Sequence, residues 1–147
     1  MFRKKYKIHI MRNKMFSPTS WSTNANDIAS LLLRLSLGLL MLSHGIPKMM
    51  KLINGNMEFG DPLGIGSPAS LFLAVFAEVI CSILTIIGFS TRLALIPLIT
   101  TMVVAAFIVH INDPLGTKEL ALIYLFGYFA LFLLGSGKYS VDATLNK

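Results

Sequence analysis

The chain has 147 residues, of which 54% are hydrophobic and only 14% are charged, and its mean hydropathy is +0.70. A soluble domain carries about 25% charged residues, so this composition excludes an ordinary soluble fold and predicts an integral membrane protein. The net charge of +6 does not indicate nucleic-acid binding, because much of it precedes the first apolar stretch and no nucleic-acid-binding motif accompanies it. The single cysteine, Cys81, excludes an intramolecular disulfide.

Residues 1–26 are predicted to form a basic, disordered tail. Its lysines and arginines are followed by a polar stretch and not by the apolar core of a signal peptide. We therefore expect the tail to stay in the cytoplasm, where its charges would contact anionic lipid headgroups. Residues 27–147 are predicted to form one membrane domain.

Four apolar stretches follow the tail, at residues 28–50, 69–89, 93–111 and 120–134. A helix needs roughly 20 apolar residues to cross a bilayer, and the first three stretches meet that length. The fourth is short unless its flanking residues from 117 to 135 are included. Asp27 is a plausible N-cap for the first helix, and Pro97 is expected to kink the third.

The connections between the stretches predict the topology. The turns at residues 89–91 and 112–116 are short, which predicts antiparallel hairpins, and a longer loop joins the first two stretches. Most basic residues fall on the side of the amino terminus, which the positive-inside rule places in the cytoplasm. We predict an all-α, up-down-up-down four-helix transmembrane bundle in a bacterial inner membrane, with both termini cytoplasmic.

Two ionisable residues lie deep within the predicted spans, where a charge costs about 2.5–3.5 kcal/mol. Arg34 lies in the first span, on one helical stripe with Gly38 and Lys48, and this polar face with small residues is expected to face the bundle interior. Glu78 lies near the centre of the second span. We predict an Arg34–Glu78 ion pair, which would also fix the helix register. The alternative is a neutral Glu78 that bonds to His44.

A second polar group is predicted at the outer ends of the spans. It combines His44, Lys48, His110 and Glu119. If the four converge, they could exchange protons or bind a polar headgroup, because histidine titrates near neutral pH. Taken singly, Lys48 and Glu119 would more simply extend to the membrane interface. Their spacing does not predict a metal site.

Tyr124 and Tyr128 share one face of the fourth predicted span. Their hydroxyl groups could donate hydrogen bonds to a cofactor in a cavity. The alternative is that both rings are packing residues or interfacial aromatics.

Several short motifs occur in a fixed order along the chain. They are Leu33-Arg34-Leu35-Ser36-Leu37-Gly38, His44-Gly45, Lys48, Ala77-Glu78, Gly88-Phe89-Ser90-Thr91-Arg92, His110, Lys118-Glu119-Leu120-Ala121-Leu122 and Gly135-Ser136-Gly137-Lys138-Tyr139-Ser140-Val141-Asp142. Together, over about residues 28–145, they resemble the DoxX family of small bacterial membrane proteins, which usually has proline where Ser136 stands. The resemblance implies a four-helix inner-membrane protein. It also implies a link to redox complexes, because some relatives are subunits of thiosulfate:quinone oxidoreductases or partners of thiol-redox proteins.

Two functions from different classes follow. In the first, the chain is a redox-associated subunit whose outer cluster binds a quinone and handles its protons, and a partner protein supplies the electrons. In the second, it is a non-enzymatic assembly factor or small-solute carrier, whose polar residues serve packing or a permeation path. The sequence leaves open whether the chain is an enzyme and what its oligomeric state is.

Overall fold

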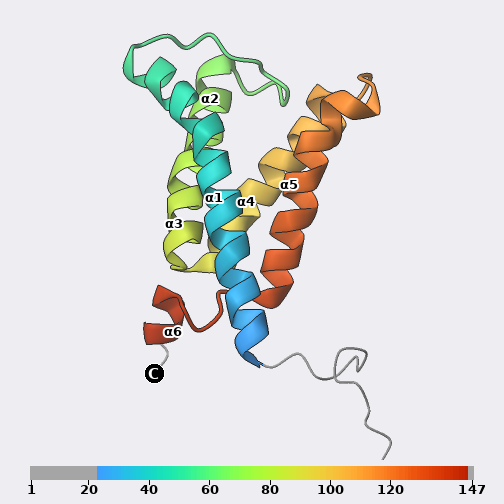
Figure 1. The fold of residues 1–147 in the computed structure, drawn as a ribbon. Coiled ribbons are helices and arrows are strands. Elements are labelled where there is room, and N and C mark those ends of the chain that lie inside the picture. The colour runs from blue at the N-terminus through green and yellow to red at the C-terminus, as the bar shows by residue number, and fades with distance from the viewer. Residues whose placement is uncertain (1–22, 146–147) are drawn as a thin grey trace, which may run out of the picture.

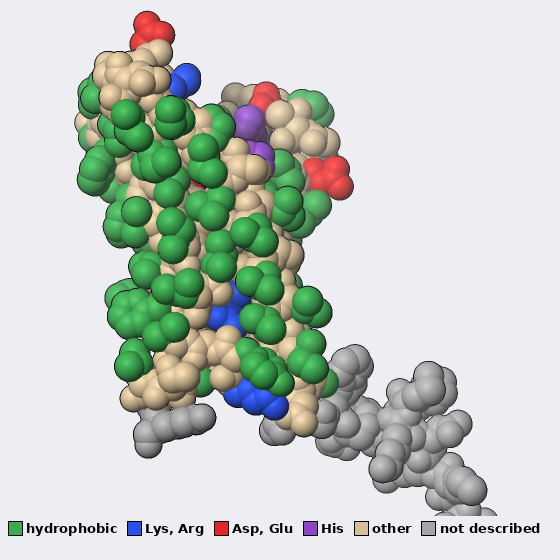
Figure 2. All heavy atoms as spheres, turned by 60° about the vertical axis from the view of Figure 1, so that its left-hand side comes forward, with side chains coloured by type: hydrophobic (Ala, Val, Ile, Leu, Met, Phe, Trp, Pro, Cys, Tyr) green, Lys and Arg blue, Asp and Glu red, His purple; other side chains and the backbone are tan. Residues whose placement is uncertain are grey.

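The computed structural model describes residues 23–145, and all regular structure in that part of the chain is helical. Four helical segments are long and apolar enough to cross a membrane: Asn24–Ile53, Ser67–Ile87, Thr91–Val109 and Leu115–Leu134. Consecutive segments run in opposite directions (Figure 1). Apolar side chains cover most of the face drawn in Figure 2, and charged side chains gather mainly toward its two ends. These observations confirm the four-helix membrane fold.

Two of the four spans are composite. The elements in chain order are α1 (Thr23–Ile53), α2 (Ser67–Val75), the π-helix η2 (Phe76–Cys81), α3 (Ser82–Ile87), α4 (Thr91–Val104), the π-helix η3 (Ala105–Val109), α5 (Leu115–Leu134) and α6 (Val141–Leu145). The second span is thus α2, η2 and α3, and the third is α4 and η3. Neither π-helix was predicted, because a helical pattern of apolar residues does not reveal one wider turn.

The first helix begins earlier than predicted. α1 starts at Thr23, so the predicted cap Asp27 lies inside the helix, where its carboxylate accepts a hydrogen bond from the backbone N–H of Lys138 at 2.9 Å. Residues 23–26, assigned to the tail, are therefore helical, and Asn24 in this turn accepts a hydrogen bond from the Lys138 ammonium group. The rest of the predicted tail, residues 1–22, lies outside the described residues.

The fourth helix is longer than its apolar stretch. α5 begins at Leu115, directly after Pro114, and its 20 residues are about 30 Å long. The sequence pattern placed the start at residue 120 because Lys118 and Glu119 interrupt the apolar run. Both lie in the first two turns of the helix, at the long-loop end of the bundle, and the helix continues through them.

α1 packs closely against the second span because it carries glycine at the contact. A Cβ atom at Gly45 would lie 2.8 Å from the backbone oxygen of Glu78, and one at Gly38 would collide with Ile86. Both glycines and Arg34 are buried. The prediction that this stripe of α1 faces the interior is confirmed.

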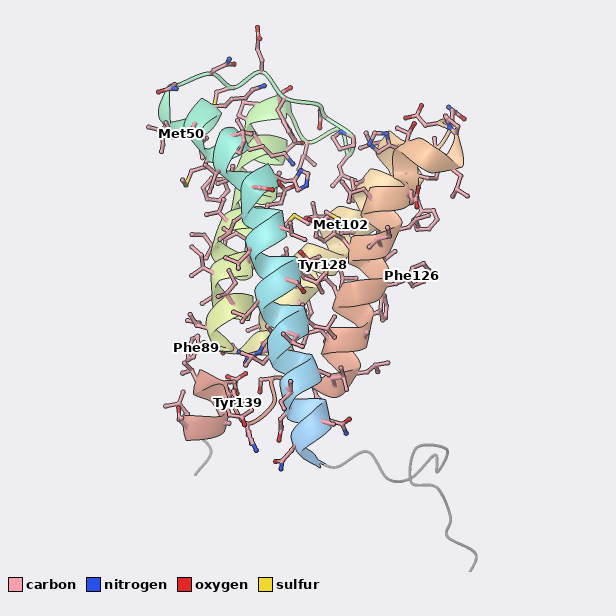
Figure 3. All side chains as sticks on the ribbon, in the orientation of Figure 1. Met50, Phe89, Met102, Phe126, Tyr128 and Tyr139 are labelled. Atoms are coloured by element: carbon pink, nitrogen blue, oxygen red, sulfur yellow. The ribbon has the colours of Figure 1, made fainter. Side chains whose placement is uncertain are left out.

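The centre of the bundle is an apolar core shared by all four spans. Met102 and Tyr128 point into it, whereas Phe126 points away from the bundle (Figure 3). Cys81 is buried in the same core. The core thus joins the α1–α2–η2–α3 pair to the α4–η3–α5 pair.

The two ends of the bundle are built differently. The α6 end holds the start of α1, the α3–α4 turn and α6. The long-loop end holds the loop of residues 54–66 and the turn of residues 110–114. The two helix pairs diverge toward the long-loop end (Figure 1).

Candidate functional site

A cavity of about 700 Å³ opens at the long-loop end, between the two helix pairs. Its wall is largely apolar. The histidine side chains lie in the notch between the two upper lobes of the molecule (Figure 2). The ionisable side chains that line the cavity are those of His44, Lys48, Glu78, His110 and Tyr124.

A partly buried ion pair forms part of the cavity wall. Lys48 Nζ lies 2.5 Å from Glu78 Oε1, and the two side chains are 29% and 3% exposed. The second carboxylate oxygen, Oε2, is buried and has no hydrogen-bond partner among the described residues. Glu78 lies in η2, and π-helices frequently occur at functional sites.

The predicted Arg34–Glu78 pair is wrong. Arg34 and Lys48 lie on the same stripe of α1 but roughly 20 Å apart along the helix axis, and it is Lys48 that reaches Glu78. Arg34 binds carbonyl groups at the α6 end instead. The alternative partner, His44, contacts Tyr124.

His44 and the two tyrosines form a short aromatic series. The His44 and Tyr124 rings meet edge to face with centroids 6.0 Å apart, and Tyr124 stacks on Tyr128 at 5.9 Å. Tyr124 lines the cavity, whereas Tyr128 is fully buried behind it and is not part of the lining. Of the two proposed cofactor-binding tyrosines, only Tyr124 is placed to touch a ligand.

The structure brings together three of the four residues in the predicted outer cluster. His44, Lys48 and His110 line the same cavity. His110 also ties the α4–α5 turn, since its Nδ1 lies 2.7 Å from Asp113 Oδ2. Glu119 is exposed and does not line the cavity. The early start of α5 places Glu119 within the helix, on a different face from Leu120 and Tyr124.

The long loop covers the mouth of the cavity. Phe59, Leu63 and Ile65 contribute to its lining, and Lys48 Nζ lies 5.6 Å from the centre of the Phe59 ring. The Asp61 carboxylate shapes this loop by accepting hydrogen bonds from the backbone of Gly66 and Ile65 and from the Ser70 hydroxyl. The bond from Gly66, followed by that from Ser70, holds the pKa of Asp61 below its ordinary value.

Sequence reasoning missed the contribution of this loop. A turn-rich loop carries no helical periodicity, so its apolar residues gave no signal that they fold over the site. Asp61 followed by proline and glycine was the available hint of a compact turn.

At the opposite end, buried polar groups tie the carboxyl-terminal segment to the bundle. Arg34 is fully buried, and it donates hydrogen bonds to the carbonyl oxygens of Ile86 at 3.3 Å and Tyr139 at 2.5 Å. The Ser30 hydroxyl donates to the carbonyl of Gly135 at 2.6 Å. Arg34 also occupies the space that a Cβ atom at Gly88 would need.

Asp142 completes this attachment by capping α4. Its carboxylate accepts hydrogen bonds from the backbone N–H groups of Ser90 at 2.7 Å and Thr91 at 3.0 Å, and from the Thr91 hydroxyl at 2.9 Å. Burial alone would raise the pKa of Asp142, but the bonds from Thr91 and Ser90 lower it below its ordinary value. We call Ser30, Arg34, Ser90, Thr91 and Asp142 the clasp.

The chemistry available at the cavity is therefore recognition of a molecule with a small polar head and an apolar body. The Lys48 ammonium group and the Tyr124 hydroxyl are donors, His44 can donate or accept, and Glu78 offers an acceptor oxygen. Within residues 23–145, no group of three His, Cys, Asp or Glu side chains is placed to hold a metal ion.

Comparisons with known proteins agree with this architecture. The DoxX family model matches residues 29–111, which run from α1 through η3 and include most of the cavity wall. An uncharacterized membrane protein of Mycobacterium tuberculosis is 31% identical over 138 residues, an alignment that covers 78% of this chain and 80% of that protein. No solved structure matches the chain.

Proposed function

The chain belongs to the DoxX family and is a multi-pass membrane protein, and we propose that it binds a quinone in the cavity at its long-loop end, as the membrane subunit of a redox system. The observation that carries this proposal is the pairing of half-buried Lys48 with buried Glu78 in the wall of a largely apolar cavity. Placing a charged pair inside a membrane domain costs free energy. Such a pair is therefore expected to have a role in the fold or in ligand binding. Here one carboxylate oxygen has no bond within the described fold.

A quinone fits the groups that line the cavity. Its two carbonyl oxygens need hydrogen-bond donors, which Lys48 and Tyr124 supply, and its apolar ring suits the surrounding side chains. The reduced form carries hydroxyl groups, which can donate to a ring nitrogen of His44 in the cavity lining. The site therefore offers partners to both oxidation states.

Reduction of a quinone to a quinol consumes two electrons and two protons. We assign the electrons to a partner protein that carries its own redox centre. This chain holds the quinone, and the two protons come from water, with His44 in the cavity lining as the group that relays them to the quinone oxygens. The basic residues that precede α1 in the sequence favour a cytoplasmic position for the start of α1, and so for the α6 end, in a bacterial inner membrane, with the cavity on the outer side.

Quinone titration of the purified protein tests the proposal. We expect a tail-less ubiquinone analogue to bind, and Glu78→Gln and Lys48→Met to weaken binding at least tenfold. Glu119→Gln is the matched control, because it makes the same change on an exposed glutamate outside the cavity. His44→Ala and Tyr124→Phe alter the lining without disturbing the ion pair, and each should weaken binding by a smaller factor.

Two results would overturn the proposal. One is no saturable binding of the analogue to a folded protein. The other is a quinone affinity that is the same in the cavity variants as in the Glu119→Gln control. Isolation from native membranes decides between the two classes of function: a stoichiometric partner with a redox centre supports the subunit role, whereas a homo-oligomer without one supports an assembly factor or carrier.

A further inference from the structure

The cavity extends well beyond its polar groups, along the face of α4 that is turned toward α2 and η2. Its lining on α4 and η3 runs from Ile96 to Val109, which is roughly 20 Å along the helix axis. On the facing span it includes Leu73 and Phe76. We call this extension the lateral groove.

The lateral groove is open toward the lipid. Leu73, Phe76 and Ile96 are 51%, 41% and 51% exposed, although all three lie inside membrane-spanning segments. A side chain that lines the cavity and is also half-exposed stands at an edge of the opening. Since the edge residues come from both α2–η2 and α4, the opening lies between these two walls.

The groove wall is apolar even where the sequence shows hydroxyl groups. Thr100 donates its hydroxyl hydrogen to the carbonyl of Ile96, and Thr101 donates to that of Pro97, both at 2.9 Å within α4. Only the methyl groups of these two side chains are then left to contact a ligand. The groove therefore offers nothing to a polar substrate, but it can take a hydrocarbon chain.

The mid-membrane part of the groove can be located by counting residues. Phe76 and Thr100 each lie roughly 15 Å from the α6 end of their spans, at about 1.5 Å per residue. They therefore face the groove from opposite walls at a similar depth. Bulk added at Thr100 would narrow the passage opposite Phe76.

We propose that the lateral groove binds the isoprenoid tail of a membrane quinone, which enters sideways from the bilayer and leaves its head beside Lys48 and Glu78. This rests on the proposed function, because the tail is assigned to the molecule whose head occupies the cavity. The groove is continuous with that cavity, it opens at bilayer depth and its wall is apolar. The ligand class is thus a lipid-dissolved quinone, and not a water-soluble one that enters past the long loop.

The test compares a long-chain quinone with its tail-less analogue on three variants of the full chain. Thr100→Trp narrows the groove. Thr100→Val removes the hydroxyl but keeps the size, and Ile123→Trp places the same large ring on a lipid-facing position, 56% exposed, outside the cavity lining. We expect Thr100→Trp to weaken long-chain binding at least tenfold and tail-less binding less than twofold, with both controls unchanged.

The outcomes separate the two proposals. If long-chain binding is unchanged in Thr100→Trp, or if both ligands lose affinity equally, the groove does not hold the tail, while the head site stands. If the tail-less analogue fails to bind any variant, the proposed function itself falls. A photoreactive benzoylphenylalanine in place of Phe76 gives an independent readout: cross-linking to the quinone tail supports the proposal, and cross-linking to a phospholipid chain in quinone-loaded membranes overturns it.

Discussion

The two ends of this bundle use buried charge in opposite ways. At the α6 end, Arg34 and Asp142 form hydrogen bonds to main-chain groups of segments that are distant in the sequence, and so hold those segments together. At the long-loop end, Lys48 and Glu78 pair with each other at the edge of a cavity. A charge whose bonds go to the main chain stabilises the fold. A charge pair in the wall of a cavity is the feature to which we assign the ligand.

The clasp explains why two stretches of the family resemblance lie far from the cavity. Residues 88–92 form the turn before α4 and its first two residues, and residues 135–142 lie beside them. Asp142 also donates its backbone N–H to the carbonyl of Gly88 at 2.9 Å. These motifs meet each other and not the cavity. Their chemistry is attachment, which separates them from Lys48 and Glu78.

The largest effect is expected from Arg34→Met. The variant leaves the carbonyls of Ile86 and Tyr139 without their buried donor and should lower the free energy of unfolding by about 3 kcal/mol. Thermal unfolding in detergent measures this. Arg92→Met is the control, because Arg92 is exposed and donates one bond to Phe132. If the two variants were equally stable, the buried hydrogen bonds of Arg34 would not stabilise the fold, and the structural role assigned to the α6 end would be wrong.

Gly45→Ala should have the next largest effect. It should lower both the stability of the fold and the affinity for the quinone. The new Cβ would lie 2.8 Å from the backbone oxygen of Glu78, so α1 or η2 must move. We expect a loss of about 1–3 kcal/mol, together with weaker quinone binding, because the shift displaces the Lys48–Glu78 pair. Gly116→Ala is the matched control, since a Cβ there meets no atom within 4 Å. Unchanged binding in a destabilised Gly45→Ala protein would show that the ion pair does not position the ligand.

Asp142→Ala tests the clasp without touching the cavity. It removes the cap of α4 and should cost about 1 kcal/mol, while quinone affinity stays as in the native chain. Hydrogen–deuterium exchange of residues 141–145 should speed up.

The same carboxylate makes the clasp sensitive to acid. The pKa of Asp142 is lower in the folded protein than its ordinary value. The stabilisation of the fold by this carboxylate is therefore complete when the pH is above the ordinary pKa. It is lost as the pH falls through the lower, folded pKa. The protection of residues 141–145 against exchange, relative to the intrinsic rate at each pH, should therefore fall below about pH 4 in the native chain and show no such fall in Asp142→Ala. The same acid response in both would assign the effect to another group.

The sequence predicted the architecture well because membrane insertion imposes length and hydropathy directly on each span. It also predicted that the glycine-bearing face of α1 is buried and that His44, Lys48 and His110 belong to one region. It failed on the partner of Glu78, because the depth of a residue along its helix does not say how far a long side chain reaches. Nothing in residues 54–66 could show that Phe59 folds back over Lys48, since that contact depends on the tertiary arrangement.

The smallest effect is expected from Tyr128→Phe, which tests where the cavity stops. The Tyr128 hydroxyl is buried and has no hydrogen-bond partner among the described residues. Removing an unpaired buried hydroxyl should leave the unfolding free energy unchanged or slightly raised. Quinone affinity should also be unchanged, because Tyr128 lies behind Tyr124 and outside the cavity lining.

Tyr124→Phe is the paired variant, since it removes the same atom one helical turn nearer the ligand. Titration of both variants with the tail-less quinone makes the comparison. If Tyr128→Phe weakened binding as much as Tyr124→Phe, the ligand would reach past Tyr124 into the core. The functional region would then extend from the long-loop end toward the α6 end, and the division between a binding end and a structural end would have to move with it.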